Sequence, residues 1–143
     1  MLIETKYLER CIATLEKAHS LLLDLDRDSI DFGMYRSASV KEFELILEQS
    51  GKLLKKCLKP FFSSSKEVDQ MYFKDIFRNA AKHGLLTIEE VERWIKYRDN
   101  RNSTAHEYGA NYAKSTLELI PSFLLDSKSL VRTIKKQNEN TSS

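Results

Sequence analysis

Apolar side chains recur every three or four residues through most of this chain. In the first segment, about residues 2–25, they form one continuous stripe: Ile3, Tyr7, Cys11, Leu15, Ala18, Leu22 and Leu25. This spacing predicts an amphipathic helix that buries one face. Acidic residues and Gly33 interrupt the stripe, and the run over residues 29–37 is predicted to be either a loop or a frayed helix start.

Two further helices follow in the middle of the chain. The second is predicted over residues 39–59 and ends before Pro60, because a proline disfavours the helical conformation of the residue before it. After a polar serine loop, the third is predicted over residues 66–83. Gly84 then fits the position just past a helix end, where the left-handed conformation is common.

The fourth helix begins at a capping box. Thr87 and Glu90 have the spacing at which each side chain accepts a hydrogen bond from the other's backbone N–H. The last helix is predicted over residues 111–135, kinked or broken at Pro121. The polar residues 136–143 are predicted to be a disordered tail, which gives one domain over residues 1–135.

The composition supports an all-α fold. Only 4 glycines and 2 prolines occur in 143 residues, and all-β folds need many turns made from such residues. A chain of this length buries roughly two-thirds of its unfolded surface, so one hydrophobic core can hold it together. We therefore predict a single domain of long helices with few connections.

Charge and cysteine content exclude several classes of protein. A net charge of +2 is too small to imply a nucleic-acid or membrane partner by itself. Cys11 and Cys57 fall in apolar stripes and are expected to be free and buried, with no metal site and no disulfide framework. No signal peptide or membrane span is evident, so we expect a cytoplasmic protein.

One segment departs from the helical pattern. Between Arg98 and His106 the only apolar residue is Ala105, whereas a bundle helix of that length should show two or three core positions. A solvated helix end or a plain loop would also explain this. Arg101 suits a phosphate and His106 can transfer protons near neutral pH. Because five helical positions separate them by roughly 140°, one site would require local distortion or a second copy of the segment.

This segment carries a resemblance to a known family. The residues from Arg101 to Tyr108 resemble the R-x4-H-x-Y signature of HEPN-domain proteins, and within them the HepT type, the toxin paired with a minimal nucleotidyltransferase antitoxin. The same group is known as nucleotidyltransferase substrate-binding proteins. Asn102 matches the small polar residue usual after the arginine. The resemblance covers nearly the whole chain and implies an up-and-down bundle of four or five helices, a homodimer, and metal-independent endoribonuclease activity without a cofactor.

The chemistry assigns roles within the signature. His106 would be the general acid or base for attack by a 2′-hydroxyl, and Arg101 would stabilise charge on the phosphate. Asn102 would orient the histidine or the phosphate. The resemblance further implies that the nucleotidyltransferase attaches AMP to Tyr108. Such a group would occupy Arg101 and exclude RNA.

Other charged residues are weaker candidates. Arg98 and Asp99 belong either to the site or to a solvated helix face. Arg78 and Lys82 are possible contacts for an RNA backbone, although exposed charges usually have no such role.

The remaining polar and aromatic candidates have simpler explanations. His83 is expected at a helix end, where it interacts with the helix dipole, and His19 at the surface. Trp94 is expected in the core or a dimer interface, and Tyr35 and Arg36 could line a cleft.

Three functions fit the sequence. The first is a ribonuclease toxin neutralised by AMP transfer, and its partners would be RNA and the antitoxin. The second is a non-catalytic nucleotide- or substrate-binding subunit of a nucleotidyltransferase. The third is a structural adaptor. Because only the first needs a titrating histidine, the presence of both Arg101 and His106 favours it.

Overall fold

The computed structural model describes residues 2–103 and 109–141, and every regular element in these ranges is a helix. The elements in chain order are α1 (Lys6–Leu22), α2 (Ile30–Leu58), the 3-10 helix η1 (Lys59–Phe61), α3 (Ser65–Asp69), α4 (Phe73–Lys82), α5 (Ile88–Ser103) and α6 (Ala110–Thr141). The predicted all-α class is confirmed. None of the described helices is both long enough and apolar enough to cross a membrane.

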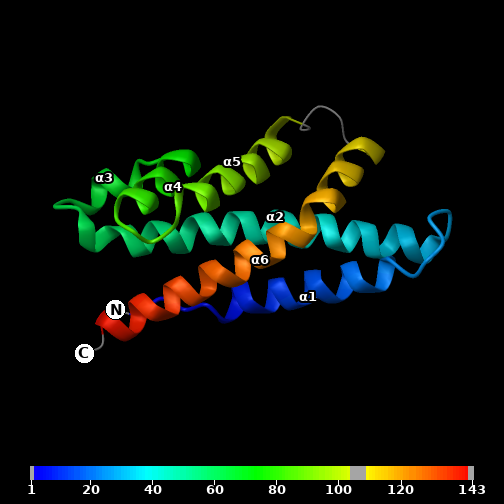
Figure 1. Ribbon diagram of the computed structural model, residues 1–143, viewed down its shortest axis with the longest axis horizontal. Coiled ribbons are helices and arrows are strands. Elements are labelled where there is room, and N and C mark those ends of the chain that lie inside the picture. The colour runs from blue at the N-terminus through cyan, green and yellow to red at the C-terminus, as the bar shows by residue number, and fades with distance from the viewer. Residues whose placement is uncertain (1, 104–108, 142–143) are drawn as a thin grey trace.

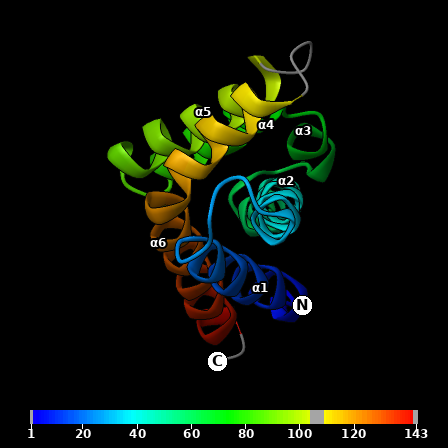
Figure 2. The same cartoon turned by 90° about the vertical axis from the view of Figure 1, so that its right-hand side faces the viewer.

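Helix α2 is the central element of the bundle. It packs against α1, α4, α5 and α6, and α5 packs in turn against α4 and α6. Figure 1 shows α2 running the length of the molecule, and Figure 2, which looks along α2, shows the other long helices arranged around it. The predicted up-and-down helical bundle is therefore confirmed.

The core is rich in aromatic side chains. The ring of Trp94 on α5 lies 5.1 Å from that of Phe77 on α4 and 5.5 Å from that of Phe123 on α6, measured between centroids. Trp94 is 0% exposed within this single chain, so it belongs to the core and not to a dimer interface. Cys11 and Cys57 are free and buried as predicted, and burial raises the pKa of the Cys57 thiol to about 12.

Local sequence signals set several helix ends. The Glu90 backbone N–H donates to the Thr87 hydroxyl at 3.1 Å, and the Thr87 N–H donates to the Glu90 carboxylate at 2.9 Å, which confirms the capping box. Gly84 has a φ of 75°, and the N–H of Leu85 donates to the carbonyl of Ala80 at 2.9 Å. This is the closing hydrogen bond of a glycine-terminated helix.

The start of α2 differs from the prediction. Residues 30–37 are helical, and Ser29 caps them, its hydroxyl accepting from the Phe32 N–H at 3.1 Å. α2 therefore begins at Ile30, nine positions before the predicted start at residue 39.

The predicted third helix is also wrong as a single element, since α3 ends at Asp69 and α4 begins at Phe73. Lys55 on α2 donates to the Asp69 carbonyl at 2.8 Å, the group that a continuous helix would bond to the N–H of Phe73. This tertiary contact supplies a donor to a carbonyl at the end of α3.

The predicted disordered tail is wrong over residues 136–141, because α6 continues to Thr141. The Asn138 side chain accepts from the Ile3 N–H and donates to the Ile3 carbonyl, both at 2.8 Å. Gln137 donates to the Cys57 carbonyl at 2.8 Å. The Asn138 contacts tie the end of α6 to the beginning of the chain, and the Gln137 contact ties it to the end of α2. Figure 1 shows the first and last described residues at the same end of the bundle.

Helix α6 continues through Pro121 as one element. Proline removes one backbone hydrogen bond and bends a helix at the preceding turn. Figures 1 and 2 show that the two parts of α6 run in different directions, the first beside α5 and the second beside α1. The predicted kink is therefore present, and the alternative of two separate helices is wrong.

Candidate functional site

Arg101 lies in the last described turn of α5, where the helix is held by polar contacts. Asn100 donates from its amide to the Thr116 hydroxyl on α6 at 3.0 Å and accepts from the Ser115 hydroxyl at 2.7 Å. Thr116 is fully buried. This clamp joins the end of α5 to the beginning of α6 and accounts for part of the polar segment that lacks core residues. It also holds the backbone that carries Arg101.

The Arg101 side chain is held by an acidic residue from the central helix. Its Nε lies 3.1 Å from Oε2 of Glu44 on α2, and the two side chains are 32% and 31% exposed. The Tyr112 hydroxyl on α6 donates to the same carboxylate oxygen at 2.7 Å. Burial and this hydrogen bond raise the pKa of Tyr112 well above its usual range, so it stays a donor. Three helices thus position one guanidinium.

Glu44 and Tyr112 are site residues that sequence reasoning missed. Glu44 falls on the polar part of an ordinary amphipathic pattern, and Tyr112 opens the last helix. Neither has a short-range signal that would point to Arg101, because Glu44 lies on a different helix from Arg101 and 68 positions from Tyr112.

A polar pocket of about 370 Å³ opens beside this cluster, lined by Lys41, Glu44, Leu45, Leu47, Glu48, Arg98 and Arg101. Arg98 and Arg101 are three residues apart on α5 and so share one face. The Arg98 guanidinium lies 5.3 Å from the centre of the Phe73 ring, a distance typical of a cation–π contact. The structure therefore brings Arg98 and Arg101 together on one pocket, as a phosphate-binding surface would require.

The other charged candidates lie elsewhere. Asp99 pairs with Lys74 on α4 at 2.8 Å, both partly exposed, so it links two helices at the surface. Arg78 is exposed and lies 3.9 Å from Asp75 on its own helix. Lys82 lies in the last turn of α4, and Asn102 is exposed on α5. None of these lines the pocket that holds Arg101.

His106 and Tyr108 lie outside the described residues. Their relation to Arg101 therefore stays a prediction of the sequence. Among the residues that the structure describes, no group of three or more histidine, cysteine, aspartate or glutamate side chains is placed to hold a metal ion.

A polar network centred on a buried carboxylate joins α5 to α6, on the N-terminal side of Arg101 in α5. Arg93 on α5 donates two hydrogen bonds of 2.8 Å to the Asp126 carboxylate on α6. The Tyr97 hydroxyl donates to the same carboxylate and lies 3.0 Å from the Ser122 hydroxyl. Asp126 is only 4% exposed. Sequence reasoning missed this network, since Asp126 lies within an apolar helix and has no motif around it.

The fold and the pocket together define a class of protein, an all-helical single domain with a cationic pocket near one helix end. The model of the family described as "nucleotidyltransferase substrate binding protein like" matches residues 4–136. A probable ribonuclease HepT of Haemophilus influenzae is 31% identical over 103 residues, which are 72% of this chain and 69% of that protein. The chain belongs to the HepT-like, nucleotidyltransferase substrate-binding family.

Solved structures share the fold. One is the structure of a Haemophilus influenzae protein, described as revealing the fold of a substrate-binding domain of a nucleotidyltransferase. It is 26% identical, with a TM-score of 0.79, over 92% of this chain and 99% of that one. A protein of Thermus thermophilus is 23% identical, with a TM-score of 0.69, over 89% of this chain and 98% of that one. The second likeness concerns the fold alone.

Proposed function

We propose that this protein is the ribonuclease toxin of a two-gene module and cuts RNA in the cytosol without a metal ion. The observation that carries the proposal is the placement of Arg101. It is half-buried, positioned by Glu44 and Tyr112, and shares a pocket with Arg98, shortly before His106 in the sequence. The similarity to a probable ribonuclease HepT supports the same activity.

The proposed reaction uses only groups of the protein and the RNA. His106 accepts the proton of a ribose 2′-hydroxyl, whose oxygen attacks the adjacent phosphorus. The bond from phosphorus to the 5′-oxygen breaks, and that oxygen receives a proton from an acid or from water. The products are a 2′,3′-cyclic phosphate and a 5′-hydroxyl end. Arg101 stabilises the charge that grows on the non-bridging oxygens, Asn102 orients the histidine or the phosphate, and Arg98 holds the strand.

An RNA-cleavage assay with a chelator present tests this proposal. The purified protein should cut single-stranded RNA and leave cyclic phosphate ends, and expression of the chain alone should arrest growth. A subunit that only binds nucleotides or substrates should bind RNA or nucleotides without cleaving, and an adaptor should do neither. The binding subunit has support of its own, because one protein that shares the fold was described as a substrate-binding domain. Binding without cleavage would establish it.

Glu44→Gln is expected to tighten RNA binding by about two- to fivefold, because this one-third exposed carboxylate competes with phosphate for Arg101 by about 1 kcal/mol or less. Titration of a labelled, non-cleavable RNA measures this. Glu48→Gln is the matched control, since Glu48 lines the same pocket and pairs with Lys52 instead. Weaker binding in Glu44→Gln would show that Glu44 mainly holds Arg101 in place.

We expect a homodimer in solution. On a straight helix five positions would separate Arg101 and His106 by roughly 140°, and a two-fold axis would bring both copies of the signature into one groove. Light scattering after size exclusion gives the mass directly. A monomer at micromolar concentration would contradict a cleft shared by two copies.

Tyr108 is the proposed acceptor of AMP from a partner nucleotidyltransferase. In that step the tyrosine oxygen attacks the α-phosphorus of ATP, pyrophosphate leaves, and the hydroxyl proton passes to solvent. Tyr108→Phe should keep its ribonuclease activity and should gain no mass when incubated with ATP, magnesium and the partner. The attached phosphate would add negative charge beside Arg101 and exclude RNA.

Intact-mass measurement of wild type and Tyr108→Phe decides the acceptor. Tyr112→Phe is a control, because Tyr112 is 5% exposed and bonded to Glu44. A mass increase that persists in Tyr108→Phe would place the acceptor elsewhere.

A further inference from the structure

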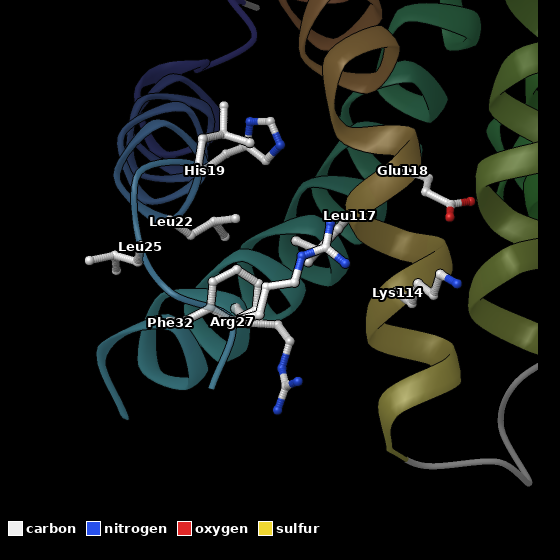
Figure 3. A pocket seen from close by; sticks show the side chains of 10 residues that line it. His19, Leu22, Leu25, Arg27, Phe32, Lys114, Leu117 and Glu118 are labelled. Carbon is white, nitrogen blue, oxygen red and sulfur yellow. The ribbon is translucent and has the colours of Figure 1, made fainter. Parts of the chain in front are cut away.

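A second pocket, of about 420 Å³, lies where α1 ends and α2 begins. Its apolar floor comes from three helices: Leu22 from α1, Phe32 from the first turn of α2 and Leu117 from α6. Figure 3 shows the Phe32 ring facing the space between α1 and α6. No residue that lines this pocket lines the pocket of Arg101.

Two arginines border this apolar floor. Arg27 comes from the connection between α1 and α2 and is exposed, and Arg36 comes from the second turn of α2 and is half-buried. No ion pair found among the described residues involves either guanidinium. Asp26 and Asp28 flank Arg27 in the chain but do not line the pocket. Two arginines beside apolar surface attract an anion, because the fork of a guanidinium matches phosphate or carboxylate oxygens.

The pocket residues that come from α6 carry no net charge. Lys114 and Glu118 are one helical turn apart and carry opposite charges, and Figure 3 shows both side chains directed away from Phe32. His19 completes the lining, and burial lowers its pKa, so its imidazole is neutral at pH 7. Because Lys114 and Glu118 offset each other, the charges of the lining residues sum to about plus two, carried by Arg27 and Arg36.

We propose that this pocket binds a nucleoside monophosphate, with the phosphate on Arg27 and Arg36 and the base against Phe32. A phosphate monoester carries about −1.5 to −2 at pH 7, which matches the two arginines, whereas a fatty-acid carboxylate would neutralise only one. The pocket volume lies in the range of small-molecule sites, and an aromatic ring offers a stacking surface to any base. The ligand is either a free nucleotide or the 5′-phosphorylated end of an RNA. This site does not rest on the proposed ribonuclease activity.

Calorimetric titration with AMP tests the site. We expect AMP to bind and adenosine to bind about tenfold more weakly or worse, since adenosine lacks the charge-assisted hydrogen bonds to arginine. The double variant Arg27→Gln/Arg36→Gln should lose about tenfold or more in AMP affinity, and Phe32→Leu should lose severalfold, since stacking contributes about 1–3 kcal/mol per base. Arg132→Gln, an exposed arginine on the distant part of α6, is the matched control and should bind AMP normally.

Two further experiments distinguish a free nucleotide from an RNA end, and this pocket from the pocket of Arg101. Competition by a 5′-phosphorylated oligoribonucleotide but not by its 5′-hydroxyl form identifies an RNA end, and competition by neither identifies a free nucleotide. The Arg101→Ala variant should bind AMP as the wild type does, so this test is independent of the cleavage site. No heat of binding at millimolar AMP, unchanged affinity in the double variant, or loss of binding in Arg101→Ala would each overturn the proposal.

Discussion

Replacing Arg101 by alanine is expected to abolish detectable RNA cleavage and toxicity while leaving the helical content unchanged. Loss of one preorganised donor to a developing anion costs about 10²- to 10³-fold in rate. The ion pair with Glu44 is one-third exposed on both sides and contributes about 1 kcal/mol or less to stability. Glu44 also keeps its hydrogen bond from Tyr112, so the fold should survive. Initial rates on a defined RNA and circular dichroism measure the two effects.

The conservative replacement and the histidine sharpen this test. Arg101→Lys keeps the charge but loses the planar fork, so a large partial loss is expected. His106→Ala should lower the rate by at least about 10²-fold if the imidazole transfers a proton. Arg132→Ala serves as the control, because this exposed residue lies on the distant part of α6. A folded His106→Ala protein with full activity would refute the mechanism.

Asp126→Ala is expected to destabilise the protein by roughly 2–4 kcal/mol, because it removes charge-assisted hydrogen bonds at a buried carboxylate, while the 44% exposed Arg93 side chain regains water. The carboxylate is nearly inaccessible and accepts hydrogen bonds from both Arg93 and Tyr97. Its loss removes both acceptor oxygens of Arg93 and leaves the Tyr97 hydroxyl with only the Ser122 hydroxyl as a partner. The free energy of unfolding in urea, compared with that of the wild type, measures the effect.

Two other variants test the cause of this loss. Asp99→Ala removes an aspartate whose partner Lys74 is partly exposed, and it should cost about 1 kcal/mol or less. Tyr97→Phe removes one hydroxyl but leaves the pair with Arg93, so an intermediate cost of about 1–3 kcal/mol is expected. Equal losses in Asp126→Ala and Asp99→Ala would show that the buried network adds nothing to stability.

Local signals in the sequence determined the helical class and several helix ends. Apolar spacing depends only on the period of the α-helix. It correctly predicted that Leu15 and Cys57 are buried, but Tyr7, placed in the same stripe as Leu15, is 50% exposed. The capping box of Thr87 and Glu90 and the glycine end at Gly84 involve residues at most a few positions apart. Such contacts form wherever the helix forms, so they can be read without knowing the fold. The signature from Arg101 to Tyr108 likewise identified the family, because it is a short run of consecutive residues.

Only the tertiary structure decided the features that depend on distant partners. Lys55 donates to a carbonyl at the end of α3, and Asn138 joins the last turns of α6 to Ile3, although nothing in the local sequence predicts either contact. The same holds for Glu44, which meets Arg101 because α2 passes beside the end of α5. The second pocket likewise exists only where α1, α2 and α6 meet. Polar side chains have many solutions on a helix surface, and their partners are chosen by the packing of the helices, which is set by the apolar faces.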